Sequence, residues 1–369
     1  MGRGLSVLLA VAFLASACSG GPAATSPTPV KTVDIKRAKL DIAYSAFVDQ
    51  DVHHVTSKKA LEAALEAIKA EVRSAGAKDD VATPAFEDKD EPQTGDFKKF
   101  TEAASQLAER AQLSPDRLAD AAIAGMIKSS PDCHTYYVDG KGTVRNSSGL
   151  VPKGSGAMVP SQGASLGGPD QAGLTGKMLP GGIAYLTWHE FAVTGNYRIT
   201  DTVKALLDKA IAQGAKAWIF DLRGNVGGNG ADAMASWFLN GEPTLIFTVK
   251  TGNAGTATAN KDLRLGSAYQ LPIAIIANDR GGSAPEVFAA SLRENKRATI
   301  VGQKTIGCLG ATSPTHMSDN AELAVAVQEF SGANTGTKYN NNGIPPDVQS
   351  DDQSAVDKAV DLLKQKLAG

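Results

Sequence analysis

Short apolar runs alternate with segments of helical spacing through the C-terminal half of this 369-residue chain, and that alternation limits the possible folds. The runs 183–188, 217–222 and 273–277 are almost wholly apolar, as strands buried on both faces of a sheet are. Helices are expected between and after these runs, at 200–213, 230–239, 284–295 and 351–367. Alternation of this kind predicts an α/β core over residues 182–369.

The segment 36–130 is predicted to form an N-terminal helical subdomain. Its clearest helix has apolar residues at i, i+4, i+7 and i+11 within a run of strong helix formers, at Leu61, Leu65, Ile68 and Val72. Ser114 and Pro115 have the chemistry of a helix N-cap and first helical position. Residues 131–181 follow with little periodicity, and the stretch 139–182 holds 12 glycines in 44 residues, which predicts a flap or long loop with short strands.

The first 17 residues are typical of a signal peptide. Arg3 is followed by an apolar run of eleven residues that starts at Leu5, which is short of the ~20 residues that a spanning helix needs. Cys18 comes directly after Ala17 and resembles the cysteine of a bacterial lipobox, so we expect it to be lipidated and to anchor the protein to the membrane. Residues 18–35 then form a flexible tether. The protein is expected outside the cytoplasm, anchored as a lipoprotein or secreted.

Composition and missing motifs exclude several function classes. A hydrophobic share of 42% and a net charge of −2 indicate a globular protein without the basic face that a general nucleic-acid binder needs. No phosphate-binding loop or G-x-G-x-x-G occurs, so no nucleotide cofactor is expected. Val193 occupies the place of the second histidine of H-E-x-x-H after His189, and the pair Cys133 and Cys308 is too few for a structural zinc site. We expect neither metal nor cofactor.

Ser283 follows the run 273–277 and two glycines, at the start of the predicted helix 284–295. One interpretation is an N-cap, because Glu286 three residues later completes a capping box, and the local sequence alone favours it. The other is a nucleophile, because free backbone N–H groups at a helix start stabilise an oxyanion. The glycine-rich turn at 221–230 has two readings as well: a plain turn, or a close backbone approach to substrate.

A serine nucleophile needs a base with a pKa near neutrality, and histidine supplies it most often. Two of the five histidines are candidates. His134 lies just past the helix that starts at Pro115, and His189 follows the run 183–188. A lone histidine is more often structural than catalytic, so the local sequence does not choose between them.

Five motifs in the same order resemble those of the C-terminal processing (tail-specific) serine peptidases, especially the short branch that includes the nisin-resistance protein. They are A-I-A-G-M-I with D-C-H-T at 122–135, D-L-R-G-N-V-G-G at 221–228, S-A-P-E at 283–286, R-A-T-I-V-G-Q-K-T-I-G at 297–307 and N-G-I-P-P-D at 342–347. The resemblance covers about residues 113–348. It implies a crotonase-like core of repeated ββα units, with the N-terminal helical subdomain forming one wall of a cleft.

The resemblance implies that Ser283 is the nucleophile and His134 its base. The branch of the family with a Ser/Lys dyad has a lysine where this chain has Cys308, so the Ser/His branch is the better fit. The spacing between the motifs at 122–135 and 221–228 is too short for the PDZ module of many relatives. Backbone N–H groups are expected to hold the oxyanion, from Gly227, Gly228 and Ala284.

The resemblance leaves the third member of a triad open, with Asp132 and Gln303 as candidates to orient the imidazole. It also brings two cysteines together. His134 and the position of the missing lysine should both lie near Ser283, so their companions Cys133 and Cys308 should be close to each other. We therefore expect a disulfide across the active cleft.

The function implied is that of an extracytoplasmic serine peptidase that cleaves peptides or unfolded proteins near their C-termini. A catalytically inactive, peptidase-like lipoprotein that binds peptides or an envelope partner is the alternative, and the absent lysine favours it. An esterase with the same dyad is a third reading, although Ser283 lacks the G-x-S-x-G elbow of such enzymes. No nucleic-acid partner is expected.

Overall fold

A computed structural model describes residues 35–149, 151–154, 156–252 and 254–369. The predicted signal peptide, Cys18 and nearly all of the tether lie outside the described residues. Within the described part, no helix is both long enough and apolar enough to cross a membrane.

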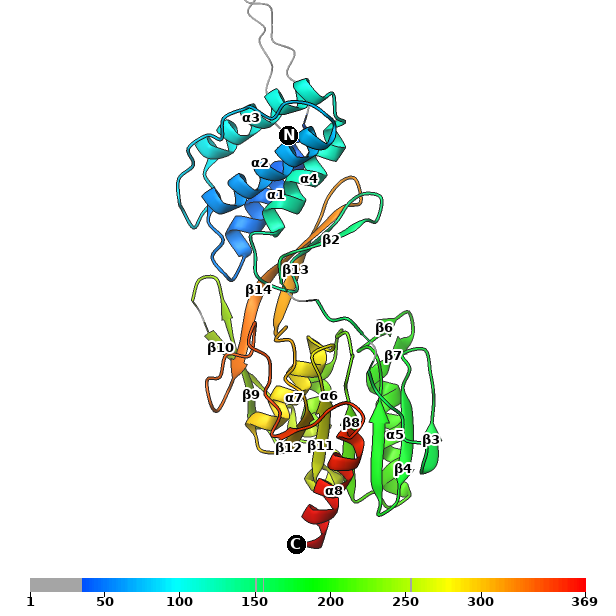
Figure 1. Cartoon of the computed structure of the whole chain (residues 1–369). Helices are drawn as coiled ribbons and strands as arrows, with labels where there is room; N and C mark the ends of the chain where they lie inside the picture. The colour runs from blue at the N-terminus through cyan, green and yellow to red at the C-terminus, as the bar shows by residue number, and fades with distance from the viewer. Residues whose placement is uncertain (1–34, 150, 155, 253) are drawn as a thin grey trace, which may run out of the picture. The chain divides into compact units, whose positions relative to one another are not determined.

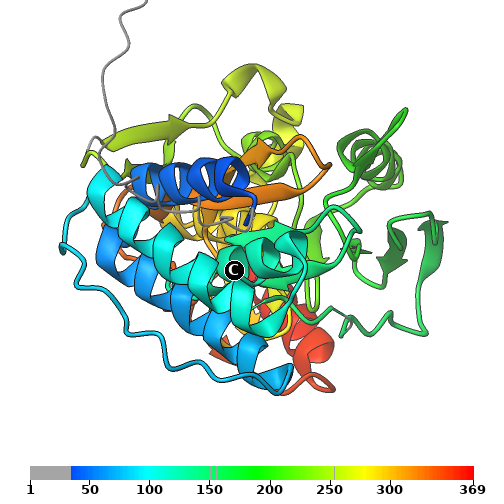
Figure 2. The same cartoon turned by 90° about the horizontal axis from the view of Figure 1, so that it is seen from above.

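Four helices form the N-terminal part of the described chain, namely α1 (Arg37–Gln50), α2 (Ser57–Ser74), α3 (Thr94–Ala111) and α4 (Pro115–Ile127). Figure 2 shows these helices, coloured blue to cyan, lying side by side. The stripe from Leu61 to Val72 is buried, because α2 packs on both α3 and α4. Ser114 caps α4 as its sequence predicts, since its Oγ accepts a hydrogen bond from the Arg117 N–H at 3.3 Å.

The core of the C-terminal part is a seven-stranded sheet in the order β15-β12-β11-β8-β5-β4-β3 (Figure 1). Its strands are β3 (Ala164–Gly167), β4 (Thr175–Leu179), β5 (Ile183–Thr187), β8 (Ala217–Asp221), β11 (Ile273–Ala277), β12 (Ala298–Gly302) and β15 (Val348–Gln349). β5, β8, β11, β12 and β15 are parallel, whereas β3 and β4 join the edge antiparallel.

Helices cover both faces of this sheet, which explains why its central strands are apolar throughout. The covering helices are α5 (Ile199–Ala212), α6 (Ala231–Ser236), α7 (Ala284–Glu294) and α8 (Ala355–Ala368). Ile183 and Tyr185 share an apolar cluster with Leu363 of α8. Their neighbours Ala184 and Leu186 belong to a second cluster with α5, α6 and α7. The fold is α/β as predicted, and β4, β5 and α5 form one ββα unit.

A second sheet connects the N-terminal helices with this core. It has the order β10-β9-β14-β1-β2, and β13 also pairs with β14. Its strands are β1 (Tyr136–Val138), β2 (Val144–Asn146), β9 (Pro243–Val249), β10 (Ala254–Thr258), β13 (Gly310–His316) and β14 (Glu322–Gly332). β14 pairs with β1 beside the helices and with β9 beside the core, and its Leu323 is buried in the cluster of the helices. The remaining short elements are β6 (Val193–Thr194), β7 (Tyr197–Arg198), η1 (Lys261–Leu263) and η2 (Gly266–Gln270).

The glycine-rich stretch 139–182 contains short strands, and two of them extend the core sheet. β4 runs through residues 175–179 and pairs with β5, so the sheet begins ahead of residue 182. Before β3 the stretch passes the loop that leads to Ser283, because the backbone N–H of Lys153 donates to the Arg280 carbonyl at 2.9 Å. β4 contains a glycine and a lysine, so it lacks the regular alternation of apolar and polar residues by which a strand is predicted from sequence.

Candidate active site

Two loops meet at the carboxyl edge of the core sheet. β8 and β11 are parallel neighbours, with Asp221 opposite Ile276, so the loops that follow them leave the sheet side by side. The Gly282 N–H donates to the Asn225 carbonyl at 3.0 Å and ties the two loops together. A Cβ at Gly281 would lie 3.0 Å from the same carbonyl, so this close approach depends on glycine.

Ser283 is the N-cap of α7 and has a φ of 71° and a ψ of −120°, a sparsely populated backbone conformation for a residue with a side chain. Its Oγ lies 3.0 Å from Nε2 of His134, which comes from the turn before β1. Ser283 thus sits at the helix start, where the cap interpretation put it, and also faces a histidine, as the nucleophile interpretation requires.

Glu286 ties the Ser283 turn to the segment that carries Cys308. Its carboxylate accepts hydrogen bonds from the N–H groups of Ser283 at 3.1 Å, Gly307 at 2.8 Å and Cys308 at 2.7 Å, and from the Thr305 hydroxyl. The side chain is buried, and burial outweighs these hydrogen bonds and raises the pKa of Glu286. The S-x-x-E motif therefore has a structural basis in this fold.

Asp132 orients the imidazole of His134. Its Oδ1 lies 3.0 Å from Nδ1 of His134 and accepts the backbone N–H of the same residue at 2.8 Å. Burial would raise the pKa of Asp132, but hydrogen bonds from His134, His53 and Asn340 outweigh burial and hold that pKa well below its usual range. A buried, ionised carboxylate behind the imidazole is the arrangement of a Ser-His-Asp triad.

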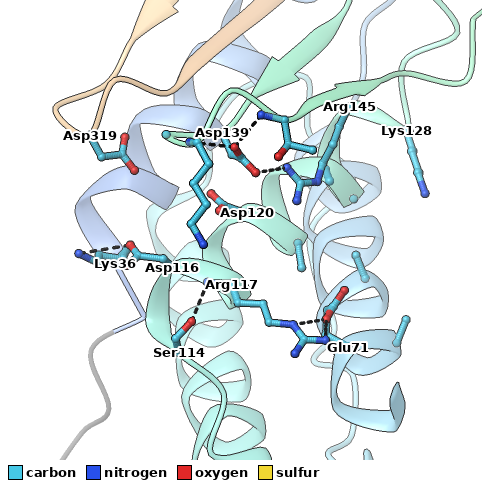
Figure 3. A pocket seen from close by; sticks show the side chains of 18 of the residues that line it. Lys36, Glu71, Ser114, Asp116, Arg117, Asp120, Lys128, Asp139, Arg145 and Asp319 are labelled. Carbon is cyan, nitrogen blue, oxygen red and sulfur yellow. Dashed lines mark hydrogen bonds and ion pairs between the residues drawn. The ribbon is translucent and has the colours of Figure 1, made fainter. Parts of the chain in front are cut away.

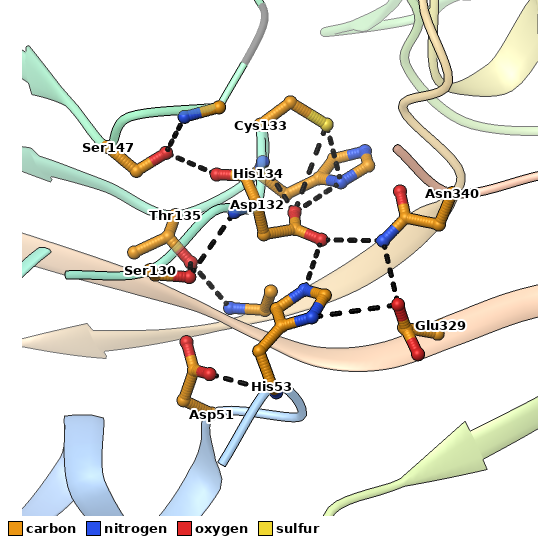
Figure 4. Close-up of polar contacts among 12 residues, drawn as sticks. Asp51, His53, Ser130, Asp132, Cys133, His134, Thr135, Ser147, Glu329 and Asn340 are labelled. Carbon is orange, nitrogen blue, oxygen red and sulfur yellow. Dashed lines mark hydrogen bonds and ion pairs between the residues drawn. The ribbon is translucent and has the colours of Figure 1, made fainter. Parts of the chain in front are cut away.

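The other oxygen of Asp132 has two partners of its own (Figure 4). Oδ2 lies 2.9 Å from Nε2 of His53, in the turn after α1, and accepts a hydrogen bond from the Asn340 side chain at 2.9 Å. Sequence reasoning missed both His53 and Asn340. Neither belongs to a recognisable motif spacing, and only the packing of α1 and β14 brings His53 to this place.

Of the two candidates that the sequence left open to orient the imidazole, Asp132 contacts His134, whereas the contacts of Gln303 lie elsewhere. The Gln303 N–H donates to the Ala277 carbonyl at 3.0 Å, and the residue lines a separate surface hollow with Asp279 and Ser350. His189 is exposed, and its carbonyl accepts the Val226 N–H at 2.9 Å. His189 thus supports the glycine-rich loop through its backbone.

Gly227 and Gly228 pack where a side chain would not fit. Their φ angles are 100° and 122°, and a Cβ would lie 2.8 Å from the Ser283 Cβ or 2.2 Å from the Phe191 carbonyl, respectively. The Gly227 N–H already donates to Asn225 Oδ1 at 3.0 Å. The N–H groups of Gly228 and Ala284 have no hydrogen-bond partner among the described residues. The N–H groups of Gly228 and Ala284, unlike that of Gly227, are therefore available to an oxyanion.

Cys133 and Cys308 form a disulfide in the structure, with a Cα–Cα distance of 5.8 Å. It lies against the imidazole, since the Sγ of Cys308 is 3.4 Å from Nε2 of His134. The two sulfurs and one nitrogen of the imidazole lie within 4.8 Å of one another. With the sulfurs bonded to each other, the thiolates that a metal would require are absent from this cluster.

A comparison with family models identifies the domain that carries these loops. Residues 182–350 match the model of peptidase family S41. This part of the chain is an S41 domain. The S41 domain includes Ser283, Glu286 and the glycine loop, whereas His134 and Asp132 precede it and belong to the turn before β1.

Relatives of the S41 domain are processing proteases. The chain is 32% identical over 152 residues to a carboxyl-terminal-processing protease of Synechocystis, covering 40% of this chain and 33% of that protein. It is 28% identical over 164 residues to the carboxy-terminal processing protease CtpA of Bacillus subtilis, covering 44% of this chain and 33% of CtpA. The chain thus matches about a third of the length of each relative.

One solved structure shares most of the fold. A lipoprotein from Streptococcus agalactiae is 16% identical and has a TM-score of 0.53, over 85% of this chain and 97% of that one. At this identity the likeness concerns the fold alone. It extends well beyond the S41 domain.

A surface hollow of about 1080 Å³ lies away from Ser283. It is lined by residues of α2, α4 and the β1–β2 hairpin (Figure 3). Several of its charged side chains are already paired, as in the contacts of Arg117 with Glu71 at 2.7 Å and Arg145 with Asp139 at 2.8 Å. The hollow contains no nucleophile–base pair, so the candidate chemistry remains at Ser283.

Proposed function

We propose that this protein is a serine peptidase with Ser283 as nucleophile, His134 as general base and Asp132 as the residue that orients the imidazole. The observation that carries the proposal is one continuous set of contacts. Ser283 Oγ lies 3.0 Å from His134 Nε2, and His134 Nδ1 lies 3.0 Å from Asp132 Oδ1. Both distances are within hydrogen-bond reach, which a nucleophile, its base and the orienting group require.

In the proposed reaction, His134 removes the proton from Ser283 Oγ as this oxygen attacks the carbonyl carbon of a peptide bond. The N–H groups of Gly228 and Ala284 bind the resulting oxyanion, and the positive end of the α7 dipole adds to this stabilisation. His134 then gives its proton to the leaving amine, which breaks the C–N bond. A water molecule, activated by the same imidazole, hydrolyses the acyl-enzyme and restores Ser283.

The proposed substrates are peptides or unfolded proteins, cut near their C-termini. The names of the Synechocystis and Bacillus relatives support this class of substrate. We also propose that the protein works outside the cytoplasm, anchored through lipidated Cys18. The Cys133–Cys308 disulfide supports this location, because disulfides persist in oxidising compartments.

Covalent labelling with a fluorophosphonate probe tests the proposal without a known substrate. Wild-type protein is expected to take up one label, which is lost in Ser283→Ala and reduced by several orders of magnitude in His134→Ala. Ser318→Ala, at an exposed serine away from the site, is the matched control and should label like wild type. A folded wild type that takes no label would contradict the proposal and favour the inactive, peptide-binding alternative.

A further inference from the structure

A second histidine contacts the side of Asp132 that faces away from His134 (Figure 4). Oδ1 of Asp132 serves His134, whereas Oδ2 lies 2.9 Å from Nε2 of His53. The Asp132 side chain has no exposed surface and that of His53 is 12% exposed, so water barely reaches this contact. One buried carboxylate therefore bridges two imidazoles.

We infer that His53 is a positioning residue for the reaction, supplied by the N-terminal helices to a site whose nucleophile belongs to the S41 domain. The inference rests on the proposed function, because it extends the contacts of Ser283, His134 and Asp132 by one further residue. His53 acts through Asp132, to which its imidazole is hydrogen bonded.

The turn that carries His53 is held firmly in place. The Val52 N–H donates to the Ala326 carbonyl of β14 at 2.9 Å, and the His53 N–H donates to Asp51 Oδ1 at 2.9 Å. The His54 N–H closes the turn on the Asp51 carbonyl at 3.1 Å. A group held by backbone contacts on a strand fixes the orientation of its partner more closely than one on a free loop does.

The charges around His53 favour its protonated form. Three carboxylates face the imidazole: Asp132, Asp51 of its own turn, and Glu329 of β14, whose Oε1 lies 3.6 Å from Nδ1. Burial lowers the pKa of His53, but these carboxylates outweigh burial and raise that pKa above its usual value. A protonated His53 stabilises ionised Asp132 and offsets part of the charge that His134 experiences.

Two consequences follow for the proposed reaction. His53 holds the Asp132 carboxylate in the plane that His134 needs, so its loss should slow the reaction. Its positive charge also offsets the negative charge of Asp132 beside the imidazole of His134, so its loss should change the pH dependence of the reaction as well as its rate. The second effect distinguishes a positioning role from a merely structural one, because it moves the pH dependence and not only the rate.

Fluorophosphonate labelling rates of the full chain, measured against pH, test both consequences. In His53→Gln the labelling rate at its maximum over pH (the plateau) should fall about tenfold. The part of the curve where the rate falls at low pH (the acid limb) should move up by about one pH unit, the size of shift that a nearby charge causes. His54→Asn, in the same turn but with its side chain directed to Asp90, is the matched control and should behave like wild type. A fall in the plateau without a shift of the acid limb would overturn the inference.

NMR titration of the imidazole signals in Ser283→Ala protein tests the same idea without any turnover. The signal of His53 should titrate above its usual pKa in Ser283→Ala and should titrate lower in Ser283→Ala/Asp132→Asn, because Asp132 is the carboxylate that contacts its imidazole. Unchanged titration of His53 between the two proteins would overturn the inference. If wild-type protein takes no label, the proposed function fails, whereas the NMR result still decides whether His53 and Asp132 are coupled.

Discussion

Nε2 of His134 lies 3.0 Å from Oγ of Ser283, although the two residues are 149 positions apart. His134 belongs to the turn before β1, in the sheet that packs on the N-terminal helices, and Ser283 begins a helix of the core. The contact therefore exists only when the second sheet is docked on the core. Activity and docking of these parts should be lost together.

Asp132→Asn should abolish most of the activity without unfolding the protein. An amide keeps the shape of the side chain but cannot stabilise the imidazolium, and the corresponding change in a Ser-His-Asp triad costs about 10⁴-fold in rate. The measurement is the rate of fluorophosphonate labelling, with circular dichroism to check folding. A rate within a factor of ten of wild type would mean that Asp132 does not serve the base.

Glu286→Gln should destabilise the protein and disturb the Ser283 turn. Both carboxylate oxygens accept backbone N–H groups, so the NH₂ group of glutamine would face a donor in either orientation. The expected loss is about 1–3 kcal/mol in the free energy of unfolding, the cost of a buried unsatisfied polar group. Urea denaturation measures it, and the exposed Glu62→Gln serves as a control that should match wild type.

Gly228→Ala should remove activity through the backbone. A Cβ there would lie 2.2 Å from the Phe191 carbonyl, at a φ of 122°, so the loop must move and take its N–H away from the oxyanion. Loss of one oxyanion donor costs about 10²–10³ in rate. Gly95→Ala, on α3 with open space around its Cα, is the control and should label normally. Equal labelling of both variants would rule out Gly228 as a donor.

Removal of the disulfide should lower stability. Cys133 and Cys308 are 175 positions apart, so their bond restricts the unfolded chain over nearly half of its length. A Cys133→Ser/Cys308→Ser variant is expected to lose about 2–5 kcal/mol in the free energy of unfolding. Urea denaturation with and without a thiol reductant measures the loss. If the reductant leaves the wild-type midpoint unchanged, the bond does not stabilise the protein in solution.

The contribution of His53 to stability should depend on pH. Its pKa is raised in the folded protein, so its contribution is fully present below the unfolded value of about 6.5 and is lost as the pH rises through the folded pKa. The difference in unfolding free energy between wild type and His53→Gln should therefore shrink as the pH rises above about 6.5. A difference that grows over this range would contradict the sign of the shift.

Much of the local structure was predictable, because it depends on neighbours in the chain. The apolar runs at 183–188 and 273–277 are strands, and Ser114 with Pro115 starts α4. β4 was less visible, since its residues lack an apolar pattern and join the sheet through backbone pairing with β5. Propensity and periodicity indicate a strand or helix only where its buried positions carry apolar side chains.

The sequence by itself determined the residue types of the site: Ser283 at a helix start, a glycine loop after a buried strand, and a histidine that follows an aspartate and a cysteine. Tertiary structure decided which of them meet. It placed Asp132 and not Gln303 behind His134 and brought His53 to Asp132 across 79 positions. Among the described residues it also left the N–H of Gly228 without a partner, while that of Gly227 is bonded. The reason is physical. Contacts over such separations arise from the packing of whole helices and sheets, and no local pattern of residues encodes them.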